Sequence, residues 1–302
     1  MSKKLTGVLP VFQTPLHEDE TIDAATLEKH LNWIYDQGAD GVVMAMVSET
    51  LRFSTEERKQ LAELACRFGG QRGSVTISVG AESTLTAINL AKHAQDHGAD
   101  AVMVIPPVAT AVGEAELYRY YKRIIEAISI PVIVQDASGY VGKPMPIALQ
   151  AQLMLDHGAD RVLFKPEATP IGPKLSELRD ATKGQAKIFE GTGGLALVDS
   201  HRRGIVGTMP GGELVWAVVA LWNALENKDE AAVYRIWPVL TTLVTMQTSL
   251  DAFLAIEKHL LVKQGVFKNT VVRGPVGYKL DDETRAEVDR LFDRLKAAVG
   301  KA

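Results

Sequence analysis

A short pattern that recurs every 60 residues constrains the fold of this chain more than any other feature. The motif Asp-x-Gly-Ala-Asp places its glycine at Gly38, Gly98 and Gly158. Each copy follows an amphipathic helical pattern and precedes a short apolar run, so the glycine predicts a helix end and the run predicts a buried strand. A period of 60 is too long for a solenoid repeat. It fits two βα units of roughly 30 residues each, so three periods imply six units.

The apolar runs predict eight strands, and therefore eight βα units. They are Gly7–Thr14, Gly41–Ala45, Val75–Val79, Ala101–Ile105, Val132–Gln135, Val162–Lys165, Lys187–Glu190 and Gly204–Met209. Helical patterns lie between them, at Asp23–Gln37, Thr55–Phe68, Thr84–His97, Glu114–Ile128 and Pro146–His157. Short strands alternating with helices predict an α/β fold, specifically a (β/α)8 TIM barrel. A doubly wound open sheet is the rival, but the residues after the first run, Pro15–Asp19, lack its glycine-rich phosphate turn.

The remainder of the chain reads as helical. The predicted helices are Val215–Asn227, Glu230–Thr248, Leu250–Gln264 and Asp281–Ala298. A barrel needs only one helix after its eighth strand. We therefore expect a barrel domain over residues 1–225 and a C-terminal helical appendage over 226–302, packed on the barrel.

Charge, cysteine content and hydropathy exclude several classes of function. The net charge is −4, so no basic surface for nucleic acid or anionic lipid is expected. The single cysteine, Cys66, rules out an internal disulfide and a zinc site of several thiolates. The longest apolar run, Leu214–Trp222, is shorter than the roughly 20 residues of a membrane span, and the N-terminus lacks the apolar core of a signal peptide. We expect a cytoplasmic protein without a membrane or nucleic-acid partner.

In a barrel of this kind the active site lies at the carboxyl ends of the strands. The residues there are Thr14, Met46–Glu49, Gly80, Pro106–Pro107, Gln135–Asp136, Lys165, Glu190–Thr192 and Thr208–Met209. Lys165 is the most informative, because a hydrophobic strand delivers it to the barrel mouth. Burial there favours the neutral amine that forms imines with ketones. A salt bridge or a phosphate contact is the alternative role.

Several of these segments together resemble one family. They are Gly7–Pro15, Met46–Glu49 followed by Phe53–Arg58, Val132–Asp136, Phe164–Lys165 and Glu190–Gly191. The chain is similar over its whole length to the dihydrodipicolinate synthase and N-acetylneuraminate lyase superfamily of Schiff-base lyases. The resemblance implies that Lys165 forms the imine and that Met46, Val47 and Ser48 hold the substrate carboxylate. It also implies a homotetramer or dimer.

Departures from the family pattern indicate which members of the superfamily the chain resembles most. The synthase and the lyase carry a proton-shuttling tyrosine on the fifth strand, where this chain has Gln135. The synthase's arginine falls at Tyr140, and the partner tyrosine after the fourth strand is missing from Pro106–Ala109. The altered set resembles the branch of 2-keto-3-deoxyarabonate dehydratases, as do Lys174–Leu175 and Gly207–Gly212.

This resemblance implies that Lys165 attacks C2 of a 2-keto-3-deoxy sugar acid. Glu49 is the first candidate for the base, with Ser48 as its hydrogen-bonding partner; a structural carboxylate is the alternative. Gln135 is expected to position a substrate hydroxyl, since an amide donates and accepts. Asp136 then points away from the interior. The far end of the substrate is expected to meet Gly191, Thr192, Thr208 and Met209.

Four functions remain open at this point. The first is a dehydratase that yields a 2-oxo acid semialdehyde, and the second is a pyruvate-releasing aldolase. The third is a keto-acid-binding protein without catalysis, and the fourth is 4-hydroxy-tetrahydrodipicolinate synthase. All four take a small 2-keto acid as ligand, and the imine removes the need for a cofactor or metal. His93 and His97 have the i, i+4 spacing of metal ligands, but no third ligand is evident, and exposed histidines on the barrel exterior are the favoured interpretation.

Overall fold

The computed structural model describes residues 3–300. Strands and helices alternate through most of the chain. The strands are β1 (Gly7–Val8), β2 (Gly41–Met44), β3 (Ser74–Ser78), β4 (Ala101–Val104), β5 (Val132–Asp136), β6 (Val162–Pro166), β7 (Phe189–Glu190) and β8 (Gly207–Thr208). The helices are α1 (Ala24–Asp36), α2 (Thr55–Gly69), α3 (Thr84–Asp96), α4 (Glu114–Ala127), α5 (Ile147–His157), α6 (Ile171–Ala181), α7 (Leu197–Arg202), α8 (Val215–Glu226), α9 (Glu230–Val244), α10 (Leu250–Lys263) and α11 (Asp282–Val299). Two 3₁₀ turns, η1 (Met46–Ser48) and η2 (Gly212–Leu214), follow β2 and β8.

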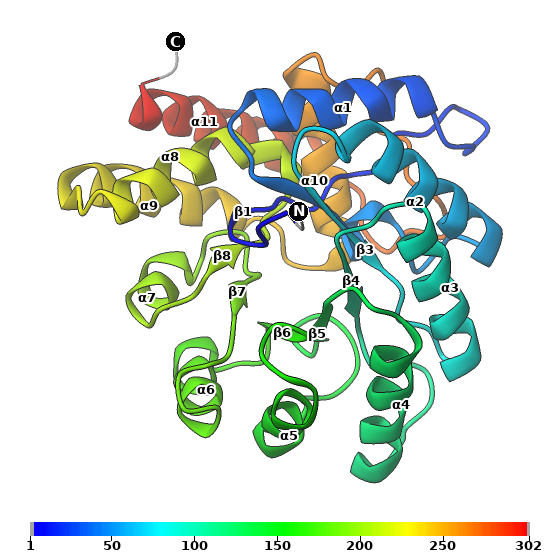
Figure 1. Cartoon of the computed structure of the whole chain (residues 1–302). Coiled ribbons are helices and arrows are strands. Elements are labelled where there is room, and N and C mark those ends of the chain that lie inside the picture. The colour runs from blue at the N-terminus through cyan, green and yellow to red at the C-terminus, as the bar shows by residue number, and fades with distance from the viewer. Residues whose placement is uncertain (1–2, 301–302) are drawn as a thin grey trace.

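All strand pairs are parallel and close into a barrel (Figure 1). Strands β2 to β6 form one sheet, and β1, β8 and β7 form another. Single bridges join them at both seams, Val11 to Val43 and Phe164 to Ile188. The predicted first strand, Gly7–Thr14, is shorter than expected because Pro10 has no N–H to donate to a ladder. The predicted (β/α)8 barrel is confirmed.

The 60-residue repeat has a clear structural role. Gly38, Gly98 and Gly158 all have φ between 90° and 94°, the left-handed conformation that ends a helix at low cost only with glycine. In the first two copies the aspartate two residues later then holds a neighbouring strand: Asp40 Oδ2 accepts from the Val8 amide at 2.9 Å, and Asp100 Oδ2 from the Val75 amide at 2.8 Å. The third aspartate, Asp160, is exposed and pairs with the Lys187 side chain instead. The repeat thus ends a helix in all three copies and fixes the start of a strand pair in two of them.

Side chains of the strands alternate between two apolar layers. Val42 and Met44 face the surrounding helices, whereas Val43 faces the barrel interior. The interior is filled by Leu9, Val11, Val43, Ala45, Ala101, Met103, Ile133, Leu163, Phe189 and Met209. The barrel axis is therefore packed, and a ligand can enter only above this layer, at the carboxyl ends of the strands.

The C-terminal helices do more than close the barrel. Helix α8 follows β8 as the eighth barrel helix, and α11 packs against α9 and α8. Helix α10 contacts both 3₁₀ turns, which places it over the barrel mouth (Figure 1). The predicted boundary at residue 225 falls at the end of α8 and stays a prediction. No helix within residues 3–300 is long and apolar enough to span a bilayer.

Candidate active site

A pocket opens at the carboxyl ends of the strands, with an empty volume of about 450 Å³ that includes solvent at its mouth. Its walls come from Val11, Ala45, Met46, Val47, Gln135, Tyr140, Lys165, Glu167, Gly191, Gly193, Met209, Pro210, Gly211, Leu250, Phe253 and Glu257. The predicted residues Met46, Val47, Gln135, Lys165, Gly191 and Met209 are thus brought together.

Strand register explains why Lys165 and Gln135 meet. They are paired residues of β6 and β5, and each follows an interior residue, Leu163 or Ile133, by two positions. Both side chains therefore point into the barrel mouth. Lys165 is 3% exposed, so its amine is shielded from bulk water. A Cβ at Gly191 would lie 2.5 Å from Lys165 Cε, so only glycine leaves the lysine its space.

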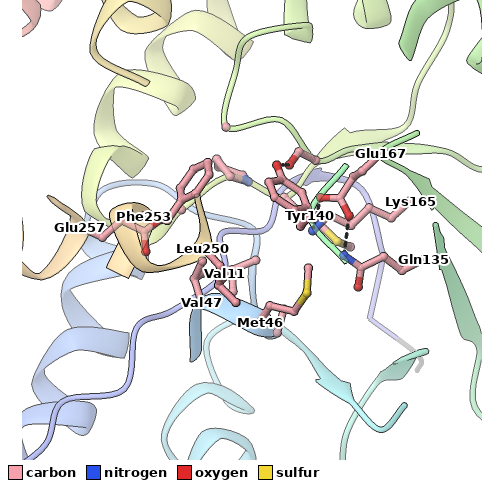
Figure 2. A pocket seen from close by; sticks show the side chains of 16 residues that line it. Val11, Met46, Val47, Gln135, Tyr140, Lys165, Glu167, Leu250, Phe253 and Glu257 are labelled. Carbon is pink, nitrogen blue, oxygen red and sulfur yellow. Dashed lines mark hydrogen bonds and ion pairs between the residues drawn. The ribbon is translucent and has the colours of Figure 1, made fainter. Parts of the chain in front are cut away.

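Glu167 was not among the site residues predicted from the sequence. Its Oε1 lies 3.4 Å from Lys165 Nζ, and Gln135 Nε2 donates to its Oε2 at 2.5 Å (Figure 2). Burial raises the pKa of Glu167, although the Lys165 charge and the amide of Gln135 oppose this shift. The sequence did contain a signal for this residue. Side chains two positions apart in a strand point to the same side, so Glu167 is expected to face the same way as Lys165. The site thus holds an amine and a carboxylate in contact, with an amide that positions the carboxylate.

Gln135 also keeps a free acceptor. Its Oε1 is buried and has no hydrogen-bond partner among residues 3–300. An unpaired buried oxygen is costly unless a ligand pairs with it. Gln135 lines the pocket, so this oxygen is a candidate acceptor for a substrate hydroxyl.

Tyr140 enters the pocket from the loop after β5. Its hydroxyl is 3.5 Å from the Gly191 carbonyl, and its ring packs edge-on against Phe253 of α10. Burial and the charges of nearby glutamates raise the pKa of Tyr140, so the hydroxyl keeps its proton. Although the fifth strand lacks a tyrosine, the loop after it supplies a phenolic hydroxyl to the same pocket.

Four predicted site residues lie outside the pocket lining. Ser48 Oγ donates to the Phe12 carbonyl and accepts from the Ala45 amide at 3.1 Å, which holds the η1 turn. Thr192 and Thr208 both donate to Glu190, Thr208 at 2.7 Å. These contacts shape the loops, and the predicted substrate contacts of Ser48, Thr192 and Thr208 stay predictions.

Glu49, the predicted base, is the fourth of these residues. Its carboxylate is buried, forms an ion pair with Lys258 of α10 and accepts from the Arg273 amide at 2.7 Å. Its backbone is left-handed, with φ 64°. These contacts fit the structural alternative, in which Glu49 ties η1 to α10, and its catalytic role stays a prediction. Asp136 accepts from the amides of Ser138 and Met145, consistent with its expected position outside the interior.

We expect the Glu49→Gln variant to lose about 3 kcal/mol of unfolding free energy, because it leaves the Lys258 ammonium buried without a countercharge. Urea denaturation measures this loss. Adding Lys258→Met removes the second charge and should recover most of the stability. A tenfold fall in kcat with unchanged stability would instead support the base role.

The histidine pair lies on the outer helices. Glu63 Oε1 of α2 is 3.1 Å from His93 Nε2 and 3.6 Å from His97 Nε2, so α2 supplies a third potential ligand that spacing alone did not reveal. Glu63 lies within 4 Å of both imidazoles, on the outside of the barrel. The cluster contributes no residue to the pocket that contains Lys165.

Comparisons with known proteins agree with this geometry. The chain is 27% identical to L-2-keto-3-deoxyarabonate dehydratase of Azospirillum brasilense, over 97% of this chain and 95% of that protein. It is 30% identical to a protein of Escherichia coli K12 called a probable 2-dehydro-3-deoxy-D-pentonate aldolase, over 51% and 52% of the two chains. The crystal structure of dihydrodipicolinate synthase from Rhodopseudomonas palustris matches with a TM-score of 0.87 at 25% identity, covering 96% and 97%.

The family model described as the dihydrodipicolinate synthetase family matches residues 4–295, nearly the whole chain. The barrel and this match agree. The chain therefore belongs to the dihydrodipicolinate synthetase family of lyases.

Proposed function

We propose that this protein is a Schiff-base-forming dehydratase of a 2-keto-3-deoxy sugar acid, with 2-keto-3-deoxyarabonate as the model substrate. The contact between Lys165 and Glu167 at the mouth of the barrel carries the proposal. The family match and the dehydratase relative support the reaction class.

Lys165 Nζ attacks the C2 ketone, and loss of water gives a cationic imine. This imine draws electrons from C3, so Glu167, 3.4 Å from the amine, can take a C3 proton and leave an enamine. The enamine expels the C4 hydroxyl, which leaves as water when it gains a proton. Loss of a C5 proton gives an enol at C4 and C5. Protonation at C4 with loss of the C5 hydroxyl proton forms the aldehyde, and protonation at C3 followed by hydrolysis of the imine gives a 2-oxo acid semialdehyde. The net change is the loss of one water molecule.

The position of the available proton favours dehydration over carbon–carbon cleavage. Cleavage requires a base that takes the proton of the C4 hydroxyl, whereas dehydration requires a donor to that hydroxyl. Tyr140, kept protonated by burial, is a donor in the pocket wall. We assign it to the departing C4 oxygen, and Gln135 Oε1 to a substrate hydroxyl.

The aldolase is the second candidate, because it shares the imine and one relative is called an aldolase. Synthase activity is disfavoured by the missing tyrosines of β4 and β5. The imine acts as the electron sink, so we propose that no cofactor or metal is required. Cytoplasmic location, the absence of nucleic-acid and membrane partners, and a homotetramer or dimer stay predictions.

One incubation distinguishes these candidates. The enzyme is mixed with 2-keto-3-deoxyarabonate, and pyruvate is followed with coupled lactate dehydrogenase while mass spectrometry follows loss of water. A product lighter by one water without pyruvate supports the dehydratase, whereas stoichiometric pyruvate establishes the aldolase. Condensation of pyruvate with aspartate semialdehyde at an ordinary rate would establish the synthase. An adduct on Lys165 without turnover of any acid would indicate a binding protein.

A further inference from the structure

Two buried carboxyl groups lie at the end of the pocket opposite Lys165. Glu257 reaches the pocket wall from α10, at the far side from Lys165 and Gln135 in Figure 2. Glu213 comes from η2 behind that wall. They are 1% and 2% exposed, so neither carboxyl is solvated by bulk water.

Gly211 brings the two carboxyls together. A Cβ on Gly211 would lie 2.3 Å from Glu213 Oε2 and 2.5 Å from Glu257 Oε1, so these oxygens are neighbours across the glycine. Their other contacts are amides: Gln13 Nε2 donates to Glu257 Oε2 at 2.9 Å, and Gln247 Nε2 donates to Glu213 Oε1 at 3.2 Å. Within residues 3–300, Glu213 Oε2 has no partner.

No cation neutralises this pair. Neither carboxyl forms an ion pair within residues 3–300, and the nearby Lys258 is already bound to Glu49 and the Val271 carbonyl. Two neighbouring carboxylates in a dry site cannot both ionise. Burial raises the pKa of both, and the charge of Glu213 raises that of Glu257 further, whereas Lys258 opposes this shift.

The remaining titratable neighbours supply no positive charge. The Tyr140 hydroxyl is kept protonated by its surroundings, and burial keeps His30, which lies behind Gln13, neutral by lowering its pKa to about 3. One proton therefore stays on the carboxyl pair, which carries a net charge near −1.

We propose that Glu257, backed by Glu213, forms the subsite for the far end of the substrate and selects an uncharged hydroxyl over a carboxylate or phosphate. A carboxyl that shares one proton both donates and accepts, which matches a hydroxyl. An anionic end would meet net negative charge, and Lys165 is the one cationic side chain in the pocket lining. The inference rests on the proposed role of Lys165 and specifies which sugar acids fit.

The test is a comparison of three 2-keto-3-deoxy acids that end in a hydroxymethyl, a carboxylate or a phosphate group. Each is trapped on the full-length enzyme with borohydride, and the Lys165 adduct is quantified by mass spectrometry, with pyruvate as the reference. Trapping reports imine formation even where turnover is absent. We expect the hydroxymethyl acid to be trapped at concentrations at least about 100-fold lower than either anionic acid.

The two failures are distinguishable. If pyruvate forms the adduct but an anionic acid is trapped as well as the hydroxymethyl acid, the subsite is rejected and the imine chemistry stands. If no acid forms an adduct on Lys165, the proposed function is rejected, and this inference with it.

A variant links the selectivity to the pair. The double variant Glu213→Gln/Glu257→Gln removes both carboxyls and with them the negative charge, so we expect the preference against anionic acids to fall at least tenfold, chiefly through KM. Glu226→Gln is the matched control, because Glu226 is exposed and pairs with His201 on the barrel exterior. Equal selectivity in the two variants would overturn the proposal.

Infrared difference spectra of wild type and Glu257→Gln give an independent readout, since the protonated carboxyl band should be lost in the variant. A wild-type spectrum without that band would also overturn it.

Discussion

Replacing Lys165 with alanine is expected to reduce turnover at least about 10⁴-fold, equivalent to roughly 5.5 kcal/mol of activation free energy. The imine is the electron sink of the proposed reaction, and among residues 3–300 no other lysine lines the pocket. Borohydride in the presence of 2-keto-3-deoxyarabonate should leave the variant unlabelled, whereas the wild type gains one adduct. Turnover and peptide mapping measure both effects.

Two further variants separate chemistry from folding. Lys165→Arg keeps a positive charge beside Glu167, but a guanidinium stays protonated and does not attack ketones, so it should be equally inactive. Lys187→Ala removes a half-buried lysine outside the pocket that pairs with Asp160, and this variant should behave as wild type. Appreciable activity in a folded Lys165→Ala protein would remove the central role of the imine.

The second large effect is expected for Glu167→Gln. The amide retains the size of the side chain but cannot take the C3 proton, so kcat should fall about 10²- to 10⁴-fold, the usual contribution of a general base. Imine formation requires only the amine, so Lys165 should still be trapped by pyruvate. Loss of turnover with retained trapping is the signature of a base that acts after the imine.

The pH profile provides a separate check. Glu167 acts as a base only when ionised, and burial raises its pKa, so acid should inactivate the enzyme at a higher pH than an ordinary glutamate would allow. The acidic limb of kcat/KM should therefore lie above about 4.3, the ordinary value for glutamate. Residual activity of Glu167→Gln with an unchanged acidic limb would move the base role to another residue, Glu49 included.

Local pattern was sufficient to predict the barrel and the lysine at its mouth, whereas the imine role of Lys165 came from the family resemblance and stays a prediction. The glycines of the repeat mark helix ends because only glycine enters the left-handed conformation at low cost, and φ values of 90–94° at all three confirm this. Strand alternation also predicts that Glu167 points to the same side as Lys165, because the two residues are two positions apart. That residue was predictable from the sequence, but the expected base was placed at Glu49.

Contacts between distant segments decided the rest of the site. Glu49 lies at the end of a barrel strand as expected, yet its partner Lys258 is 209 residues away in the chain. Helix α10, predicted as part of an appendage, covers the mouth and brings Leu250, Phe253 and Glu257 into the pocket wall.

The sequence by itself therefore determined the barrel, the strand order and the lysine at the mouth, because helix ends, strand alternation and the β/α period depend on neighbouring residues. Only the tertiary structure decided which carboxylates line the pocket and which are bound to the protein. That choice depends on where the C-terminal helices pack, and no local periodicity records the packing of segments 200 residues apart.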